Sequence, residues 1–328
     1  MWDGIQVLGN SAASQIIANQ GLCETNTGAT IANARLGIVA GDATYDEEFE
    51  YLVASLNSGV TDAFHRLLLI VHITLAVMKP SLMFYQYRAA INNFPEQFQL
   101  RKVDSVGNSL LSKTYIDSLK NIVIYSLIPS IDSNMFIGCY SVNYGTGSRQ
   151  VFIAKVNLNG DTIWTKTISP LQGQLYYGQY LIETSDHGLL ITGAIADSSI
   201  TDADFFILKT DSLGNYQWMQ TYGGNNFDDA FSSVETPDHG FLTLGFTRSF
   251  GFGNSGNRDD LLVKWDSLGN YQWHKTYGTI DDEFAIGIVA CMDGNYILAS
   301  DRYTQLPLHS DSRIIKVDVQ GNIIWQKQ

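Results

Sequence analysis

A block of ten residues recurs along this chain of 328 residues at a nearly constant spacing. In its clearest copies, 209–218 and 264–273, a short apolar segment ends in Lys, an Asp-Ser-Leu-Gly turn follows, and a Trp stands four residues after the Gly. More divergent copies occupy 155–164, 316–325 and 102–111, the last with Leu in the place of the Trp. A period of this size predicts an array of similar supersecondary units.

The turn glycines of these blocks are separated by 53, 54, 55 and 52 residues; they are Gly107, Gly160, Gly214, Gly269 and Gly321. Within one period, short runs rich in apolar, β-branched and aromatic residues are bounded by Gly, Asn, Asp and Pro, which is typical of strands and tight turns. The clearest unit predicts four strands, at 204–209, 216–222, 228–235 and 241–247.

Such four-stranded sheets bury both faces when they stack radially. The repeat therefore predicts an all-β fold, a β-propeller of about five four-stranded blades with a degenerate N-terminal unit. We expect the recurring tryptophan rings to pack between neighbouring sheets. These residues are Trp164, Trp218, Trp273 and Trp325.

The units do not divide the whole chain evenly. They lie near 97–150, 151–203, 204–258 and 259–311, with a partial unit at 312–328. Residues 36–96 form a degenerate blade with an apolar insertion, and 1–35 show no assignable pattern. Because the chain ends two strands into a unit, we expect the strands at 314–318 and 323–327 to complete a blade with those around 49–53 and 67–75. A fragment of a longer array is the alternative, and a truncated or mis-started product without independent function is another.

The most apolar run, Leu67 to Met78, has three interpretations. It is short for a transmembrane helix, contains His72 and stops at Lys79-Pro80. It has the length of a secretory signal core but lies far from the first residue. The plain interpretation is a buried fourth strand over Leu67 to Leu75.

Composition limits the classes of partner. The net charge of −13 disfavours nucleic acid and anionic membrane as ligands, because both need a basic surface. We expect no membrane insertion. Three widely spaced cysteines, Cys23, Cys139 and Cys291, have no metal-binding or redox spacing and are expected to be single buried thiols in strands.

The Lys-x-Asp-x-x-Gly-x-x-x-Trp block resembles the repeats of bacterial secreted β-propeller proteins, and it is similar to the tryptophan-docking motif of quinoprotein and WD-like propellers. The resemblance covers 97–328, with a weaker echo at 36–59. It implies export to the cell surface or medium, although the first residues show no recognisable signal. Some relatives are labelled endoglucanases or occur beside carbohydrate-active domains. Pyrroloquinoline quinone is not expected, because the chain has no vicinal cysteine pair and too few blades.

Acidic pairs recur in one loop of three units, as Asp46-Glu47, Asp228-Asp229 and Asp281-Asp282-Glu283. Carboxylates from different blades could meet at one mouth and act in glycoside hydrolysis, with Asp228, Asp229, Asp281 and Asp282 as catalytic candidates. Asp228, Asp281 and Glu283 could instead bind Ca²⁺, the one cofactor considered. The simplest interpretation is that each Asp caps its own loop by accepting backbone N–H groups.

Other repeated polar residues have structural and functional interpretations. Lys102, Lys155, Lys209, Lys264 and Lys316 predict either a basic ring around a channel or repeated ion pairs between blades. His187 and His239 share one turn position and are expected to be exposed rather than metal ligands. The glycine-rich segment with Phe250, Phe252 and Asn254 is the preferred ligand-binding lip.

No catalytic motif of a known class is present. We therefore expect a non-catalytic binding or scaffold module, exported or surface-exposed, with a carbohydrate or protein as its ligand. The alternative is a polysaccharide hydrolase that uses carboxylates of the acidic loops.

Overall fold

The computed structural model describes residues 5–7, 23–25, 37–38, 49–56, 67–74, 81–88, 97–104, 108–116, 119–197, 202–252, 256–305 and 308–327. Side chains are described for most of these residues from Leu100 onward. The chain divides into two compact units, Met1–Tyr115 and Ile116–Gln328. In the described parts of both, the regular elements are strands.

The first unit contains a two-stranded and a six-stranded antiparallel sheet. Strand β1 (Ile5–Val7) pairs with β2 (Cys23–Thr25), a hairpin that the sequence did not suggest. The larger sheet has the order β3-β4-β5-β6-β7-β8. Its strands are Gly37–Ile38, Phe49–Leu56, Leu67–Thr74, Ser81–Arg88, Gln97–Asp104 and Ser109–Ile116.

The apolar run at Leu67 therefore forms a strand, as the plain interpretation predicted, while its predicted burial concerns side chains outside those that the structure describes. Strand β5 pairs with β4 along its whole length and contacts β6 through His72. Among the described residues there is no helix of the length and apolarity needed to span a membrane.

The second unit consists of four consecutive four-stranded sheets, which we number blades 1 to 4. Blade 1 comprises β9 (Lys120–Pro129), β10 (Met135–Asn143), β11 (Arg149–Val156) and β12 (Thr162–Ile168). Blade 2 comprises β13 (Leu175–Glu183), β14 (Leu189–Ala196), β15 (Ala203–Thr210) and β16 (Tyr216–Tyr222). Blade 3 comprises β17 (Asp228–Glu235), β18 (Phe241–Thr247), β19 (Asp259–Trp265) and β20 (Tyr271–Tyr277). Blade 4 comprises β21 (Asp282–Ala290), β22 (Tyr296–Gln305), β23 (Leu308–Val317) and β24 (Ile323–Lys327).

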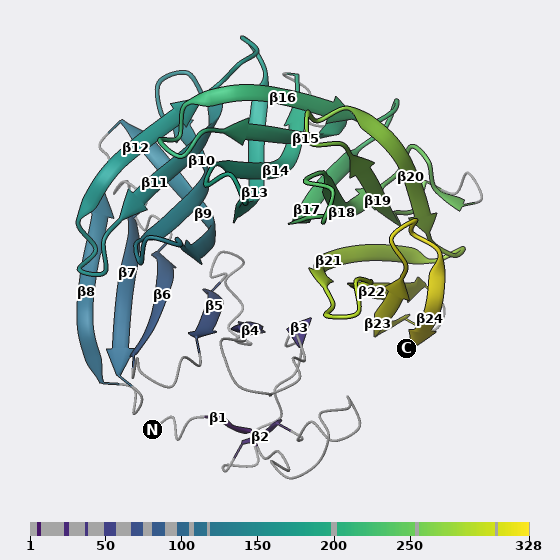
Figure 1. Cartoon of the computed structure of the whole chain (residues 1–328), viewed down its shortest axis with the longest axis horizontal. Helices are drawn as coiled ribbons and strands as arrows, with labels where there is room; N and C mark the ends of the chain where they lie inside the picture. Colours follow the sequence, from purple (N-terminus) through teal and green to yellow (C-terminus); the bar gives the residue numbers. More distant parts are fainter. Residues whose placement is uncertain are drawn as a thin grey trace. The chain divides into compact units, whose positions relative to one another are not determined.

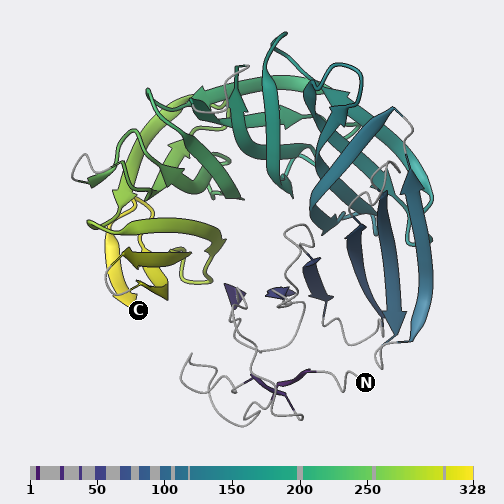
Figure 2. The same ribbon diagram turned by 180° about the vertical axis from the view of Figure 1, so that it is seen from behind.

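Within this unit the blades follow one another around an arc. The first strands β13, β17 and β21 lie on its inner side, and the fourth strands β12, β16 and β20 lie on its outer side (Figure 1 and, from behind, Figure 2). This is the arrangement of a β-propeller, so the predicted all-β propeller fold is confirmed.

The blades start at a different point in the repeat from the units of the sequence. Each sheet combines the last two strands of one such unit with the first two of the next, as in blade 2, where β13 and β14 precede β15 and β16. The expected closure of a blade by strands from both chain ends is wrong for the same reason. Strands β23 and β24 instead pair with β22 and complete blade 4.

The hydrophobic core lies between consecutive blades because neighbouring residues of a strand point to opposite faces of its sheet. In β15, Phe206 and Leu208 join the cluster shared with blade 1, whereas Phe205 and Ile207 join the cluster shared with blade 3. Leu242, Leu244 and Leu262 of blade 3 form the next cluster with residues of blade 4.

Three of the four recurring tryptophans, Trp164, Trp218 and Trp273, dock as the sequence predicted. A Cβ atom added to Gly214 would lie 2.7 Å from the Trp164 ring, and one added to Gly269 would lie 2.6 Å from Trp218. Trp273 and Gly321 repeat the contact at 3.0 Å. Each of these tryptophans belongs to the fourth strand of one blade and packs on the turn glycine of the next.

Candidate functional site

Four of the recurring lysines form ion pairs inside their own blades. Each stands near the end of a third strand and reaches the turn between the first and second strands of the same sheet. The nitrogen–oxygen distances are 2.6 Å for Lys155–Asp132, 2.9 Å for Lys209–Asp186, 2.9 Å for Lys264–Asp238 and 2.5 Å for Lys316–Asp293. The expected pairing between blades is wrong for these four, because the second and third strands are direct neighbours.

These pairs hold their carboxylates ionised. Burial alone would raise the pKa of Asp186, but hydrogen bonds from Thr184 and Lys209 lower it to about 2. The same balance, with Thr236 and Lys264 as donors, lowers the pKa of Asp238 to about 2. The ammonium groups of Lys209 and Lys264 also donate to backbone carbonyls of their own blades. Their charges are therefore paired within the blade and do not form a basic ring for an anionic ligand.

The two turn histidines occupy a left-handed backbone position. His187 and His239 have φ values of 63° and 61°, and Ser133 and Gly294 stand at the same place in blades 1 and 4 with 64° and 78°. Both histidines are exposed, as predicted. Among the described residues no group of three or more His, Cys, Asp or Glu side chains has the geometry of a metal site.

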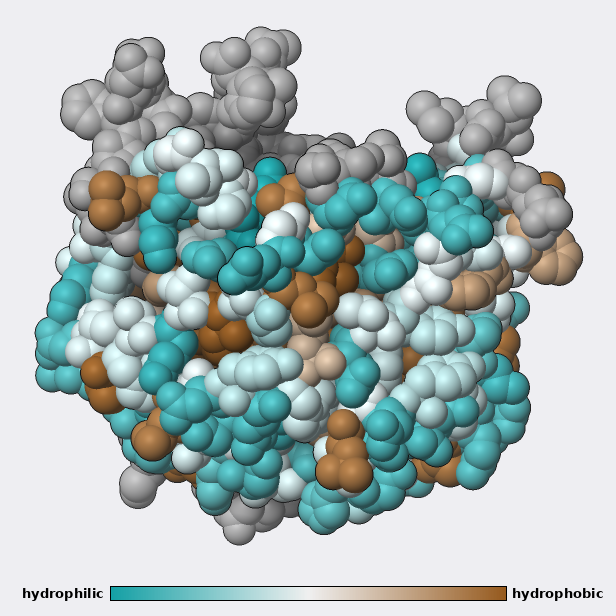
Figure 3. Space-filling model, turned by 90° about the horizontal axis from the view of Figure 1, so that it is seen from above, coloured by the Kyte–Doolittle hydropathy of each residue, from teal (hydrophilic) through white to brown (hydrophobic). Residues whose placement is uncertain are grey.

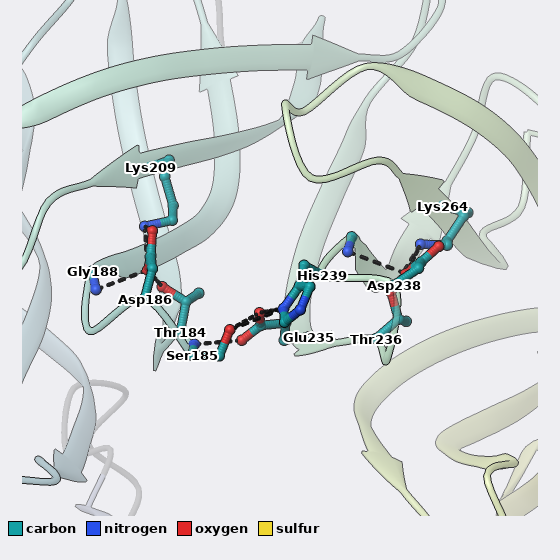
Figure 4. A network of polar contacts seen from close by, with 11 residues as sticks. Thr184, Ser185, Asp186, Gly188, Lys209, Glu235, Thr236, Asp238, His239 and Lys264 are labelled. Atoms are coloured by element: carbon teal, nitrogen blue, oxygen red, sulfur yellow. Dashed lines mark hydrogen bonds and ion pairs between the residues drawn. The ribbon is translucent and has the colours of Figure 1, made fainter.

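A carboxylate at the end of the first strand ties consecutive blades together. Glu235 accepts hydrogen bonds from the Ser185 amide at 2.7 Å and hydroxyl at 2.6 Å, and His239 lies beside it (Figure 4). Glu183 of blade 2 likewise accepts hydrogen bonds from blade 1, from the Ile131 amide at 2.9 Å and the Ser130 hydroxyl at 3.2 Å. We call these contacts the inter-blade clamps.

Between blades 3 and 4, both the acceptor and the donor residue of the inter-blade clamp are replaced. Ala290 replaces the glutamate, and Pro237, which has no amide hydrogen, replaces the donor residue. A hollow of about 340 Å³ lies there, lined mostly by apolar surface and including Glu235, Pro237, Ala290 and Cys291. The prediction for Cys291 is wrong, because its thiol is half-buried and lies in the turn after β21 rather than in a strand.

The acidic-loop candidates are mostly engaged in structural contacts. Asp228 is fully buried and accepts from the Thr247 hydroxyl and from the amides of Gly224, Arg248 and Ser249. This is the loop cap that the simplest interpretation predicted. Asp229 is also buried; desolvation raises its pKa well above the usual value, and its Oδ1 has no hydrogen-bond partner.

The candidates of blade 4 are paired with arginines. Arg302 donates to Asp281 from Nε at 2.9 Å, and Arg258 donates to both carboxylate oxygens of Asp282 at 3.0 Å. Glu283 is buried and accepts from Thr279 Oγ1 at 2.6 Å. None of these three carboxylates is free to act on a ligand without first breaking a charge-assisted bond.

The two phenylalanines of the predicted ligand-binding lip have different environments: Phe250 belongs to an aromatic stack, and Phe252 is exposed. Phe250 stacks on Tyr222 with ring centroids 5.3 Å apart, and Tyr222 stacks on Tyr271 at 4.9 Å and 2°. Phe252 is 65% exposed. Asn254 lies outside the described residues.

A second hollow, of about 360 Å³, lies between the fourth strands of blades 1 and 2. We call it the outer groove. Ile168, Pro170 and the Tyr216 ring supply apolar surface, and Lys166, Ser169 and Asn215 supply polar groups. On the face drawn in Figure 3, hydrophobic residues reach the surface in several patches among hydrophilic ones.

The equivalent place between blades 2 and 3 is occupied by the protein's own rings. Ile168 of blade 1 and Tyr222 of blade 2 are equivalent, because each ends a fourth strand and pairs with the start of the third strand of its sheet. Tyr216 of blade 2 and Tyr271 of blade 3 are equivalent in the same way, because each begins a fourth strand and pairs with the end of the third. Between blades 2 and 3 these positions hold two parallel tyrosines, whereas between blades 1 and 2 they hold Ile168 and a tyrosine that is 47% exposed. Sequence reasoning missed the groove, although the Gly-Asn-Tyr sequence shared by 214–216 and 269–271 is visible in the repeat.

No protein-family model matches the sequence, and no curated protein matches it. Solved structures of similar fold include a Dos1 propeller, with a TM-score of 0.41 and 11% identity over 74% of this chain and 55% of that one. They also include a puromycin hydrolase (0.46, 10%, 74% and 37%) and an endo-arabinase from Bacteroides thetaiotaomicron VPI-5482 (0.46, 11%, 73% and 91%). The chain thus spans about half of the first protein and over a third of the second. The likenesses concern fold alone.

Proposed function

We propose that this chain is a non-catalytic carbohydrate-binding module and that the outer groove is its binding site. The observation that carries the proposal is the half-exposed Tyr216 ring on the wall of a hollow that also presents hydrogen-bonding groups. Small-ligand sites combine apolar or aromatic surface with a few polar groups that fix the orientation of the ligand.

The neighbouring junction supports a ring-shaped ligand. There, a flat side chain, Tyr222, lies parallel to the tyrosine equivalent to Tyr216 at a centroid distance of 4.9 Å. Since Ile168 is the smaller residue at the Tyr222 position, the same geometry leaves room for a ring supplied from outside. A pyranose has an apolar face that can stack on an aromatic ring and hydroxyls that can reach the polar edge.

The polar edge suits hydroxyl groups. Lys166 Nζ donates to Asn215 Oδ1 at 2.9 Å, and an ammonium group has three donors, so two remain for other partners. The Ser169 hydroxyl also lines the hollow. Donors and acceptors held at a partly open edge can bind a sugar directly or through water.

The hydrolase alternative has less support. Glycoside hydrolysis needs two carboxyl groups that flank one bond, about 5 Å apart or roughly 6.5–9.5 Å apart. Asp228 accepts from Thr247 of its own blade, and Asp281 pairs with Arg302 of blade 4. Asp282 pairs with Arg258, which precedes β19 of blade 3, and Asp229 is buried. The outer groove has no carboxylate among its lining residues.

The location of the module is part of the proposal. We infer export to the cell surface or medium, in keeping with the resemblance of the repeat to those of secreted propellers. Detection of the chain in the medium or in an outer surface fraction of its source cells would test this.

Titration calorimetry with soluble oligosaccharides tests the function. Tyr216→Ala is expected to abolish binding, and Tyr216→Phe to retain most of it, because the ring face carries the contact. Tyr271→Ala is the matched control, since it removes an equally exposed tyrosine where the hollow is already filled. Binding that survives Tyr216→Ala in a folded protein would overturn the site, and release of reducing ends would restore the hydrolase.

A further inference from the structure

The charge of Lys166 distinguishes it from the four lysines that form ion pairs inside their blades. No carboxylate of the described residues lies within 4.0 Å of its ammonium group, and its hydrogen-bond partner is the neutral amide oxygen of Asn215. The charge of Lys166 acts on Asp211, but the pKa of that carboxyl is lowered chiefly by the hydrogen bond from the Asn215 side chain.

The Asp211 carboxylate does not form an ion pair with Lys166, because both of its oxygens accept hydrogen bonds within its own turn. Its Oδ1 accepts from the amides of Leu213 at 2.9 Å and Asn215 at 2.8 Å, and its Oδ2 accepts from the Asn215 side-chain amide at 2.9 Å. The turn therefore uses both carboxylate oxygens to shape itself. It also fixes Asn215, which in turn positions the ammonium of Lys166 on the groove.

The stem of Lys166 lies against the turn that contains Gly214. A Cβ atom added to Gly214 would lie only 2.9 Å from Lys166 Cγ, which shows that the lysine side chain passes close over this turn. A cation that is already oriented by packing and by one hydrogen bond loses less side-chain entropy when it binds an anion than a free surface lysine does.

We propose that the outer groove selects an anionic sugar, whose carboxylate or sulfate ester pairs with Lys166 while its ring lies on Tyr216. This proposal rests on the proposed function and adds its ligand class. The net charge of −13 makes a preference for anionic sugars informative, because the protein as a whole repels polyanions. Such a preference must therefore come from a local contact.

The chain itself supplies the control residue. In the next blade the position of Lys166 is occupied by Gln220, because Lys166 pairs with Ile153 as Gln220 pairs with Ile207. Lys166→Gln therefore removes the charge, keeps a long polar side chain and uses a residue that the repeat already accepts at this position.

The experiment compares oligosaccharides of equal length by titration calorimetry at low and high salt: oligogalacturonate, neutral galactan oligomer and sulfated carrageenan oligomer. Wild type is expected to bind at least one anionic probe about fivefold or more tightly than the neutral one, in line with a single charge-assisted contact of about 1 kcal/mol or more. Lys166→Gln is expected to remove that preference and its salt dependence. Because Lys166 also belongs to the polar edge of the groove, neutral binding is expected to weaken too, but by a smaller factor than binding of the anionic probe.

The outcomes separate the two levels of the proposal. Tighter binding of oligogalacturonate assigns the anion as a carboxylate, and tighter binding of the carrageenan oligomer assigns it as a sulfate ester. Equal binding of all three probes, still lost in Tyr216→Ala, overturns the charge selection but keeps the binding function. A preference that survives Lys166→Gln also overturns it, and binding of none overturns both.

Discussion

Two kinds of turn in this chain place a residue in the left-handed backbone region, and only one of them requires glycine. In the turns after the first strands of the blades, the position holds Ser133, His187, His239 or Gly294. In the turns before the fourth strands it is always glycine, with φ values of 72° to 81°. The difference is the tryptophan of the preceding blade, which leaves no room for a Cβ atom on Gly214, Gly269 or Gly321.

This predicts unequal costs for the same substitution. Gly269→Ala is expected to lower the free energy of unfolding by about 3 kcal/mol, because a left-handed alanine costs about 1 kcal/mol and the overlap with Trp218 adds roughly 2 kcal/mol. Gly294→Ala, with nothing within 4 Å of the added Cβ atom, is expected to cost about 1 kcal/mol or less. Urea unfolding of both variants checks the difference, and equal costs would show that Trp218 does not depend on this contact.

The sequence was most informative about single positions whose role is local. In the turns before the fourth strands of blades 2 and 3, a local Asp caps its own turn: Asp211 and Asp266 each accept two amides of these turns. The partners of the lysines could not be found in this way. Asp186 lies 23 residues before Lys209 and Asp238 lies 26 before Lys264, so the pairing is visible only once the sheet order is known.

At the scale of elements, strand positions were predictable and their grouping into sheets was not. The predicted strands at 216–222, 228–235 and 241–247 coincide with β16, β17 and β18. A repeat of fixed period, however, has the same sequence wherever a unit is taken to begin. The boundary is set by tertiary contacts: β16 and β17 are not hydrogen-bonded to each other, and the inter-blade core lies between them.

The inter-blade clamp gives a test at this scale. Glu235→Ala is expected to lower the free energy of unfolding by about 1–2 kcal/mol, because the carboxylate accepts both the amide and the hydroxyl of Ser185. Adding Ser185→Pro would copy the junction between blades 3 and 4, where Ala290 faces Pro237. In the Glu235→Ala background this second change is expected to cost little, whereas alone it should cost about as much as the first.

Thermal unfolding of the four proteins in this cycle measures the coupling between the two residues. Additive costs would mean that the clamp does not join the blades. The outer groove lies at the opposite edge of the blades from the clamp, so none of these variants should change sugar binding.

For the second unit as a whole, stability depends on how well consecutive blades adhere, and one junction uses a buried charge where the others use apolar packing. Arg313 of blade 4 contacts Asp260 of blade 3 at 2.6 Å, and both side chains are at most 3% exposed. The equivalent positions between blades 2 and 3 are Leu261 and Phe205, which belong to one hydrophobic cluster. Desolvation raises the pKa of Asp260 to about 6 even though Arg313 opposes the shift.

Removing one partner of this pair should therefore weaken the unit more than removing both. Arg313→Leu is expected to cost about 3–5 kcal/mol, because it strands the buried carboxyl groups of Asp260 and Glu283. Arg313→Leu with Asp260→Phe, which copies the junction between blades 2 and 3, is expected to regain much of that loss. Denaturant unfolding followed by tryptophan fluorescence measures both, with Trp218, Trp273 and Trp164 at the blade junctions as reporters. If the double variant is as unstable as the single one, the ion pair contributes more than the apolar contact it replaces. The blades would then be joined by charge at this point rather than by shape.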